Sequence, residues 1–214
     1  MIPLIARLKK QRHRDIALAH DIAVEVLFNI FDKAVLHGGT AIWRCYKGNR
    51  FSEDIDVYIP RDIKKLDLFF DSLEKKGFVI EKKKISENSL FSNLSLNRTA
   101  IRLEAIFRKA DGILKEYETT EGNLMTIYTL SPEELIDEKV NTYLKRLKIR
   151  DLYDIFFLLR EVNNKSEIIP KIKILITNFK PPIDKNELNI LILEGLVPNT
   201  EKMLDYIKSY IGNK

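Results

Sequence analysis

The sequence predicts an α+β fold, in which a mixed sheet flanked by helices is followed by an all-helical C-terminal part. Three observations support this class. Helix-like and strand-like periods alternate through the first part of the chain, three strand-like runs then follow one another, and only helical patterns occur after a strong helix start at Ser131. We therefore expect an α/β domain over residues 1–125 and a helical domain over residues 126–214.

The strand that bears on function is expected over residues 54–59, where Ile55, Val57 and Ile59 alternate with Asp54, Asp56 and Tyr58. Before it, apolar residues at three- and four-residue steps predict a helix over 12–32. The other elements expected in this half are a strand over 34–37, helices over 40–46 and 62–76, the latter closed by Gly77, and strands over 78–85, 89–97 and 99–107.

The helical part begins with Ser131-Pro132-Glu133-Glu134. Ser131 is expected at the N-cap, Pro132 at the first helical position, and Glu134 as the second half of a capping box. Helices are expected over 132–146, 149–162, 166–178, 184–194 and 199–211.

Composition limits the class of protein. The 214 residues are 45% hydrophobic and 31% charged, which is typical of a folded globular chain. No run reaches the ~18 apolar residues of a membrane span, and the N-terminal charges follow the apolar stretch, the wrong order for a secretory signal. The single cysteine, Cys45, excludes an internal disulfide framework and fits a reducing cytoplasm.

The strongest functional pattern is His37-Gly38-Gly39-Thr40 followed by Asp54-Ile55-Asp56. Paired glycines let the backbone approach a ligand, and the helix that starts there offers N–H groups to a phosphate. Two carboxylates on one strand face favour a divalent metal, for which oxygen ligands select Mg²⁺ or Mn²⁺. Alone, each half is also typical of an ordinary turn or a polar strand face. Together they predict phosphoryl or nucleotidyl transfer.

Glu104 is the acid expected to complete the site, as a third metal ligand or a base. It lies in an otherwise apolar strand, where an isolated acid is costly unless it is paired or bound to metal. The alternative is an ion pair between Arg102 and Glu104 on a solvent-facing strand.

A second cluster lies in the helical part, at Lys139, Asp151 and Asp154. The helix that carries the two aspartates is apolar almost all round, so they require cationic partners, for which Lys139, Lys148 and Arg150 are the candidates. Lys139 and Asp151 are expected to serve a triphosphate. The alternative is a structural ion-pair network, and for Asp154 the two interpretations stay equally open.

The net charge of +5 suits an anionic partner such as a nucleotide or RNA, although a lysine-rich solvated surface gives the same charge. Basic residues gather in three groups, each of which either follows an RNA backbone or is simply solvated. The groups are Arg7, Lys9, Lys10, Arg12 and Arg14; Lys75, Lys76 and Lys82–Lys84; and Lys145, Arg146 and Lys148.

The run G-G-T-A-I-W-R-C-Y-K-G-N-R-F-S-E-D-I-D-V resembles the signature of the nucleotidyltransferase AbiEii/AbiGii toxin family, within the DNA polymerase beta-like superfamily. E-E-L-I-D-E-K-V and K-I-R-D-L-Y-D-I-F-F-L resemble its second signature, in the same order and separation. The resemblance covers roughly residues 15–162.

The resemblance implies a nucleotidyltransferase-type sheet in which Asp54 and Asp56 bind Mg²⁺ and the phosphates of a nucleoside triphosphate (NTP). Members of the family are toxins of toxin–antitoxin or phage-defence systems, and some transfer nucleotides onto tRNA. The third acidic position of the superfamily is often Asp, so Glu104 is longer than usual. Nucleotide binding is carried over to Gly38, Gly39, Thr40, Arg50, Ser52, Lys139 and Asp151.

We therefore expect a cytoplasmic, Mg²⁺-dependent enzyme that moves a nucleoside monophosphate (NMP) from an NTP to an acceptor hydroxyl of RNA or tRNA. An antitoxin protein is an expected partner. The rival hypothesis is a non-catalytic module that binds a nucleotide in the same pocket.

Overall fold

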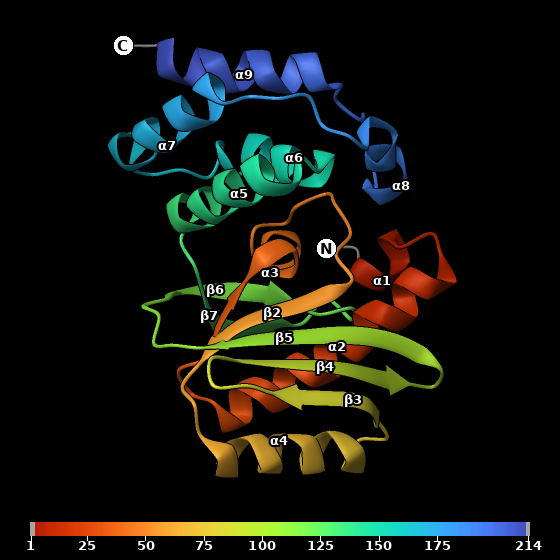
Figure 1. Ribbon diagram of the computed structural model, residues 1–214. Helices are drawn as coiled ribbons and strands as arrows, with labels where there is room; N and C mark the ends of the chain where they lie inside the picture. Colours follow the sequence, from red (N-terminus) through yellow and green to blue (C-terminus); the bar gives the residue numbers. More distant parts are fainter. Residues whose placement is uncertain (1–2, 213–214) are drawn as a thin grey trace. The chain divides into compact units, whose positions relative to one another are not determined.

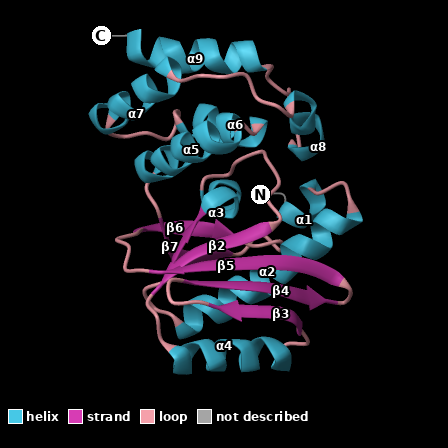
Figure 2. Cartoon of the chain, viewed as in Figure 1, coloured by secondary structure: helices cyan, strands magenta, loops and turns pink. Residues whose placement is uncertain are grey.

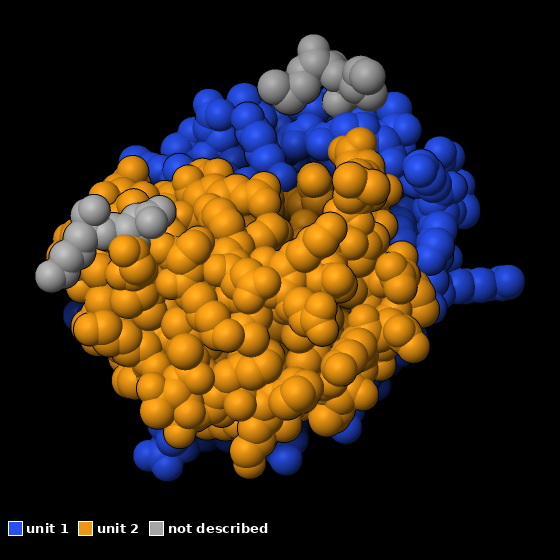
Figure 3. Space-filling model, turned by 90° about the horizontal axis from the view of Figure 1, so that it is seen from above, with its two compact units in different colours: residues 1–47, 51–129 blue, residues 48–50, 130–214 orange. Residues whose placement is uncertain are grey.

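The computed structural model describes residues 3–212. The chain forms two compact units, coloured separately in Figure 3: the first comprises residues up to Lys47 and Phe51–Thr129, the second Gly48–Arg50 and Leu130 onward. Figure 2 shows the strands of the first unit in magenta. The α+β class is confirmed, whereas the domain boundary at residue 125 stays a prediction and lies inside a strand.

The first unit is built on a seven-stranded mixed sheet with the order β3-β4-β5-β2-β1-β7-β6. β1 pairs with β7, and β2 with β5, in parallel, while the other neighbours are antiparallel. The strands are β1 (Val35–His37), β2 (Asp54–Ile59), β3 (Val79–Ile85), β4 (Ser89–Leu96), β5 (Thr99–Phe107), β6 (Ile113–Glu118) and β7 (Leu124–Thr129).

Helices α2 and α4 contact each other and lie along β5 and β3, respectively (Figure 1). Asp62 caps the start of α4 by accepting from the Lys65 N–H, and Gly77, at φ +92°, ends it while the Phe78 N–H donates to the Leu73 carbonyl. The helices of this unit are α1 (Leu4–Arg7), α2 (Gln11–Ile30), α3 (Gly38–Cys45) and α4 (Ile63–Lys75).

The β6–β7 hairpin was not among the expected strands. Its apolar residues do not alternate cleanly, since Ile113, Leu114 and Leu124 are exposed while Tyr117 is buried. β7 is held by the sheet itself, because Thr129 pairs with Leu36 and its hydroxyl donates to the Leu36 carbonyl at 2.7 Å. Tertiary pairing thus outweighs a weak local pattern.

The second unit consists mainly of helices, and its first helix begins as expected. Ser131 accepts from the Glu134 N–H while the Glu134 carboxylate accepts from the Ser131 N–H, so the capping box is confirmed. The helices are α5 (Pro132–Arg146), α6 (Ile149–Leu158), α7 (Lys165–Thr177), α8 (Leu188–Leu191) and α9 (Thr200–Gly212), with a 3₁₀ turn at Lys185–Glu187.

The single helix expected over 184–194 is wrong. After α8 the backbone becomes extended, and Ile192 forms a bridge with Arg50 while the Leu193 N–H donates to the Asn49 carbonyl at 2.8 Å. Helix α6 stops at Leu158, four residues before its expected end at 162. None of the helices within residues 3–212 is long and apolar enough to cross a membrane.

Candidate active site

The glycine turn and the paired aspartates meet in the first unit. Gly38 has φ +69°, and a Cβ built on it would lie 2.2 Å from Oδ2 of Asp56. No side chain fits between this backbone and that carboxylate, so glycine is required for conformation and for space. The first turn of α3, which contains Gly39 and Thr40, therefore begins directly beside Asp56.

Thr40 connects the same turn to the other aspartate. Its hydroxyl donates to the backbone carbonyl of Asp54 at 2.5 Å, and Thr40 itself is fully buried. His37 is paired with Asp56 across β1 and β2, and its ring stacks on Tyr58 with the ring centroids 3.9 Å apart. The glycine turn and the strand that carries the two aspartates are thus fixed to each other by this hydrogen bond and by strand pairing.

Strand β5 places two charged side chains next to the aspartates. In the parallel β2–β5 register, Arg102 lies opposite Asp54 and Glu104 opposite Asp56. The Arg102 guanidinium donates to the Asp54 carboxylate at 2.5 Å and lies 3.2 Å from the Glu104 carboxylate. The side chain of Glu104 is 48% exposed, so it lies on a solvent-facing strand face, not in a buried strand as its expected role assumed.

Electrostatics couple these four side chains. Partial desolvation, followed by the charge of Asp56, raises the pKa of Glu104, while Arg102 opposes the rise. The hydrogen bond to Asp54 raises the pKa of Arg102. Three carboxylates beside one guanidinium leave a net negative charge, which a divalent cation can neutralise.

The donor set therefore fits a divalent cation in chemical type, with Asp54 and Asp56 two positions apart on β2. Between residues 3 and 212, however, no three His, Cys, Asp or Glu side chains converge into a group that holds a metal ion as it stands. In this structure Arg102, not a third acid, is the group that contacts the Asp54 carboxylate.

The segment before β2 is anchored by a buried histidine. His20 of α2 is fully buried, and its Nε2 donates to the carbonyl of Glu53 at 3.1 Å. Burial, aided by the charge of Arg44, lowers the pKa of His20 to about 4, so the ring is neutral at physiological pH. Ser52, the residue before Glu53, is also buried.

A buried polar network that the sequence did not predict holds α3 in place. The guanidinium of Arg44 is completely buried, pairs with Asp21, donates to the Glu118 carbonyl at 2.7 Å and lies over the Tyr117 ring. Asp21 in turn accepts from Tyr117 and from the N–H and hydroxyl of Thr120. Each of these contacts joins residues that are 23 or more positions apart in sequence, so no local spacing signals the network. Cys45, next to Arg44, is a buried thiol whose pKa is raised to about 12 by desolvation.

Three of the predicted site residues come together in the second unit. Arg50 donates through two nitrogens to the Asp154 carboxylate, at 2.7 and 2.8 Å. Lys139 lies 2.8 Å from Asp154 and 3.7 Å from Asp151. Although burial alone would raise the pKa of Asp154, Arg50 and Lys139 lower it below its usual value.

The cationic partners of the two aspartates differ in part from those expected. Lys139 is confirmed, but Arg50 and Arg146 take the places proposed for Arg150 and Lys148. Arg146 holds Asp151 through two hydrogen bonds of 2.7 and 2.8 Å, whereas Lys148 lies 3.4 Å from Asp184. Arg50 was not identified as a partner because 104 residues separate it from Asp154.

The N-terminal basic group is partly used within the first unit. Arg7 pairs with Glu118 at 2.5 Å, Arg12 lies 3.5 Å from Glu53, and Arg14 donates to the Leu8 carbonyl. Arg7, Arg12 and Arg14 of this group therefore make contacts within the protein.

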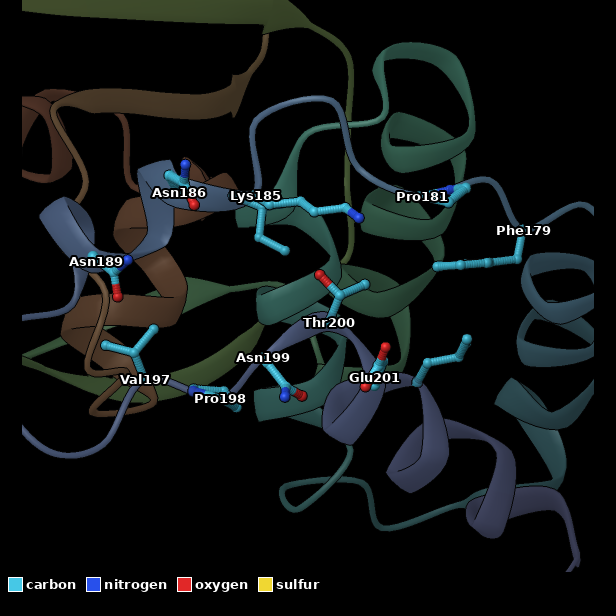
Figure 4. Close-up of a pocket in the computed structure, with 12 residues that line it drawn as sticks. Phe179, Pro181, Lys185, Asn186, Asn189, Val197, Pro198, Asn199, Thr200 and Glu201 are labelled. Carbon is cyan, nitrogen blue, oxygen red and sulfur yellow. The ribbon is translucent and has the colours of Figure 1, made fainter.

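A separate pocket of about 460 Å³ lies in the second unit (Figure 4). None of the site residues predicted from the sequence lines it. Its wall combines apolar side chains with amides and one lysine: Ile149, Phe179, Pro181, Lys185, Asn186, Asn189, Val197, Pro198, Asn199, Thr200, Glu201 and Leu204.

Comparison with known proteins gives one family match. The model of the nucleotidyl transferase AbiEii toxin family, of type IV toxin–antitoxin systems, matches residues 22–179. No curated protein matches.

Solved structures with the same fold include nucleotidyltransferases. The chain is 16% identical to MenT4, a nucleotidyltransferase toxin from Mycobacterium tuberculosis, covering 97% of this chain and 87% of that one at a TM-score of 0.64. It is 18% identical to JHP933 from Helicobacter pylori, covering 95% and 91% at 0.65. A putative nucleotidyltransferase, also from H. pylori, is 20% identical, covering 95% and 94% at a TM-score of 0.64.

Proposed function

Because this chain belongs to the AbiEii nucleotidyl transferase toxin family, we propose that it transfers an NMP from an NTP to an acceptor hydroxyl of RNA, foremost tRNA. The acceptor oxygen bonds to the α-phosphorus, the bond to the β-phosphate oxygen breaks, and pyrophosphate leaves. The observation that carries the proposal is the contact of the Gly38 turn with Asp56, which joins a phosphate cradle to paired carboxylates.

Each residue of the first unit has a role in this proposal. Asp54 and Asp56 hold Mg²⁺ or Mn²⁺, which supplies charge neutralisation at the phosphates. Gly38, Gly39 and Thr40 present the first turn of α3 to the triphosphate. Glu104 accepts the proton of the acceptor hydroxyl, and its raised pKa makes it a better base than an ordinary glutamate.

The cluster of the second unit is proposed to be nucleotide-binding, with Lys139 and Arg50 as its cations and Asp151 as a positioning residue. Lys139, Arg50 and Arg146 carry three positive charges against the two of Asp151 and Asp154. The excess of one positive charge favours an anionic ligand, and the 40% exposed Arg146 side chain reaches solvent. Ser52 is proposed to contact the nucleotide from the segment before β2.

A direct test uses each of the four labelled NTPs with total tRNA and Mg²⁺. We expect label from at least one NTP to appear in RNA, and Asp56→Asn to abolish it. The exposed acid Asp111 supplies the matched control, since Asp111→Asn leaves the site intact. Two results together would refute the enzymatic function: no label transferred from any of the four NTPs, and the same growth inhibition by Asp56→Asn as by the wild type.

The family also implies a protein antitoxin as a partner and action in the cytoplasm, both of which we include in the proposal. Co-expression with the product of the neighbouring open reading frame is expected to relieve growth inhibition. If growth inhibition persisted on co-expression with the product of each neighbouring open reading frame, the antitoxin would be contradicted. The proposed enzymatic activity would not be affected by that result.

The ion pair between Arg102 and Asp54 favours a second candidate function, a nucleotide-binding module without turnover. In such a module Glu104 is dispensable, and Glu104→Ala keeps its affinity for the NTP. Calorimetry with and without Mg²⁺, combined with a turnover assay, separates the two functions. NTP binding by the wild type without any transfer would favour the module.

A further inference from the structure

The candidate catalytic side chains of β2 and β5 lie in rows that continue across the sheet onto the strands beyond β5. From β2 the sheet continues through β5 and β4 to the edge strand β3 (Figure 1). Residues paired across neighbouring strands point to the same face. Two rows therefore cross the solvent-facing side of the sheet: Asp56, Glu104, Phe91 and Lys84 in one, and Asp54, Arg102, Asn93 and Lys82 in the other.

Spacing puts the far end of these rows within reach of a polymer bound at the near end. Neighbouring strands are ~4.8 Å apart, so Phe91 lies roughly 10 Å from Asp56 and Lys84 roughly 14 Å from it. A strand of nucleic acid whose terminal hydroxyl meets Glu104 has its adjoining nucleotides over β4 and β3.

The side chains at that end have the chemistry of single-stranded nucleic-acid binding. Phe91 is half-buried, and the Lys82 amino group lies 5.5 Å from the centre of its ring. A pocket of about 410 Å³ is lined by Lys82, Lys84, Ser86, Ser89 and Phe91. An aromatic ring flanked by lysines binds a base by stacking and the adjoining phosphates by charge.

Lysines on an edge strand also have a general role, because they prevent edge-to-edge pairing of sheets. Of the three lysines, Lys83 is the one that this general role accounts for. It points to the opposite face, where its amino group lies 4.2 Å from the Phe70 ring centre and 3.4 Å from Asp67. Lys82 and Lys84 flank Phe91 instead. Glu81, at the bulge beside Lys82, lines a neighbouring hollow with Asp54 and Arg102.

We propose that Phe91, Lys82 and Lys84 form the acceptor platform, a site that binds the single-stranded end of a nucleic acid and directs its terminal hydroxyl to Glu104. This inference rests on the proposed function, because it identifies where the acceptor of that reaction lies. Phe91 stacks on an unpaired base, and the two lysines contact phosphates.

The test measures binding of short labelled RNA and DNA oligonucleotides, single-stranded and duplex, by fluorescence anisotropy over a salt series. The variants are Lys82→Gln/Lys84→Gln and Phe91→Ala. Lys83→Gln is the matched control, because it removes one charge from the same strand on the opposite face. Phe91→Tyr keeps the ring, so it distinguishes loss of stacking from loss of folding.

We expect the double lysine variant to reduce the slope of log affinity against log salt by about 1.4, since each phosphate contact on a single strand contributes about 0.7. Phe91→Ala is expected to weaken single-strand binding about 5- to 150-fold, the equivalent of one stacked base, and Phe91→Tyr to restore it. Comparing the affinities for the RNA and DNA oligonucleotides shows whether the platform prefers ribose or deoxyribose.

Lys83→Gln is expected to bind as the wild type does, and NTP binding is expected to be unchanged in all four variants. Equal oligonucleotide affinity in the wild type, the double lysine variant and Phe91→Ala would overturn the acceptor platform, as would a preference for duplex that these changes leave intact. Failure of the proposed function looks different: oligonucleotides would bind through these residues, but no NTP would be consumed.

Discussion

Gly38 and Asp56 are in such close contact that no side-chain carbon fits between the backbone of one and the carboxylate of the other. A Cβ at Gly38 would lie 2.2 Å from Oδ2, 2.9 Å from Cγ and 3.0 Å from Cβ of Asp56. The glycine of the turn and the second aspartate of the strand therefore act as one unit, although 18 positions separate them in sequence.

The first prediction concerns Gly38→Ala. It imposes a left-handed backbone on a residue with a Cβ, at a cost of about 1–2 kcal/mol, and it displaces the Asp56 carboxylate. We expect nucleotide transfer to fall at least about 100-fold, the effect of a displacement on the order of 1 Å at a reacting centre.

Gly195→Ala is the matched control for that change. Gly195 also has positive φ, at +89°, but nothing lies within 4 Å of a Cβ built on it. It therefore carries the backbone strain without the clash. Thermal unfolding is expected to respond to both changes, and transfer only to Gly38→Ala. Equal losses of transfer would contradict the role assigned to the contact.

The second prediction concerns Arg102, whose guanidinium contacts the carboxylates of Asp54 and Glu104. Arg102→Gln removes that positive charge, so we expect Mn²⁺ to bind roughly three- to tenfold more tightly, a modest gain because the side chain is 43% exposed and screened by solvent. Calorimetric titration measures the change.

Arg98→Gln serves as its control, since Arg98 is exposed in the β4–β5 turn. It removes the same charge from the protein but not from the carboxylates. Unchanged Mn²⁺ affinity in Arg102→Gln would show that Asp54 is not a metal ligand.

The third prediction concerns the buried ion pair between Arg50 and Asp154. Arg50→Ala leaves a buried carboxylate with one fewer cation, so we expect the free energy of unfolding to fall by about 3–5 kcal/mol. Arg50→Lys is expected to recover only part, because an ammonium does not reproduce two parallel hydrogen bonds. Urea titration measures both.

An exposed pair provides the comparison. Lys171 and Asp137 are 2.7 Å apart, but their side chains are 41% and 40% exposed. Lys171→Ala is expected to cost at most about 1 kcal/mol. Comparable losses at Arg50 and Lys171 would mean that the buried cluster contributes no more than a surface ion pair.

The fourth prediction is a pH dependence caused by His20. Its pKa is about 4 in the folded chain and 6.5 in the unfolded chain, so between those values the unfolded state binds more protons. Folding stability must therefore fall as the pH falls from 6.5 to 4, by about 3 kcal/mol in total for this group.

His20→Gln removes that titration while retaining an N–H for the Glu53 carbonyl. Unfolding free energies measured from pH 7 to pH 4 are expected to fall less steeply in the variant than in the wild type. Parallel curves would show that His20 does not remain neutral in the folded chain.

Elements with local signals were predicted well from the sequence. The strand over 54–59 and the helix over 132–146 have the expected limits. Both are recognised by local signals, an alternating pattern and a capping box, that involve only a few neighbouring residues. The β6–β7 hairpin and the break after Leu191 were not predicted. Both depend on partners far along the chain, since Thr129 pairs with Leu36 and Leu193 with Asn49.

The candidate site shows the same division. Gly38, Asp54 and Asp56 were identified from spacing, and they meet because a turn and the next strand are neighbours in the sheet. Arg102 was expected only as an alternative partner of Glu104, yet it contacts Asp54, which lies opposite it through the parallel β2–β5 register. Pairing between distant strands has no local signature in the sequence.

The sequence by itself determined the family of this protein, most of its helices and strands, and the residues of the glycine turn and paired aspartates. Periodicity, capping and turn chemistry act over a few residues, so they can be recognised along the chain. Only the tertiary structure decided what faces those aspartates, which cations hold Asp151 and Asp154, and which lysines share a face with Phe91. Strand register and burial set these relationships, and both result from contacts between residues far apart in sequence.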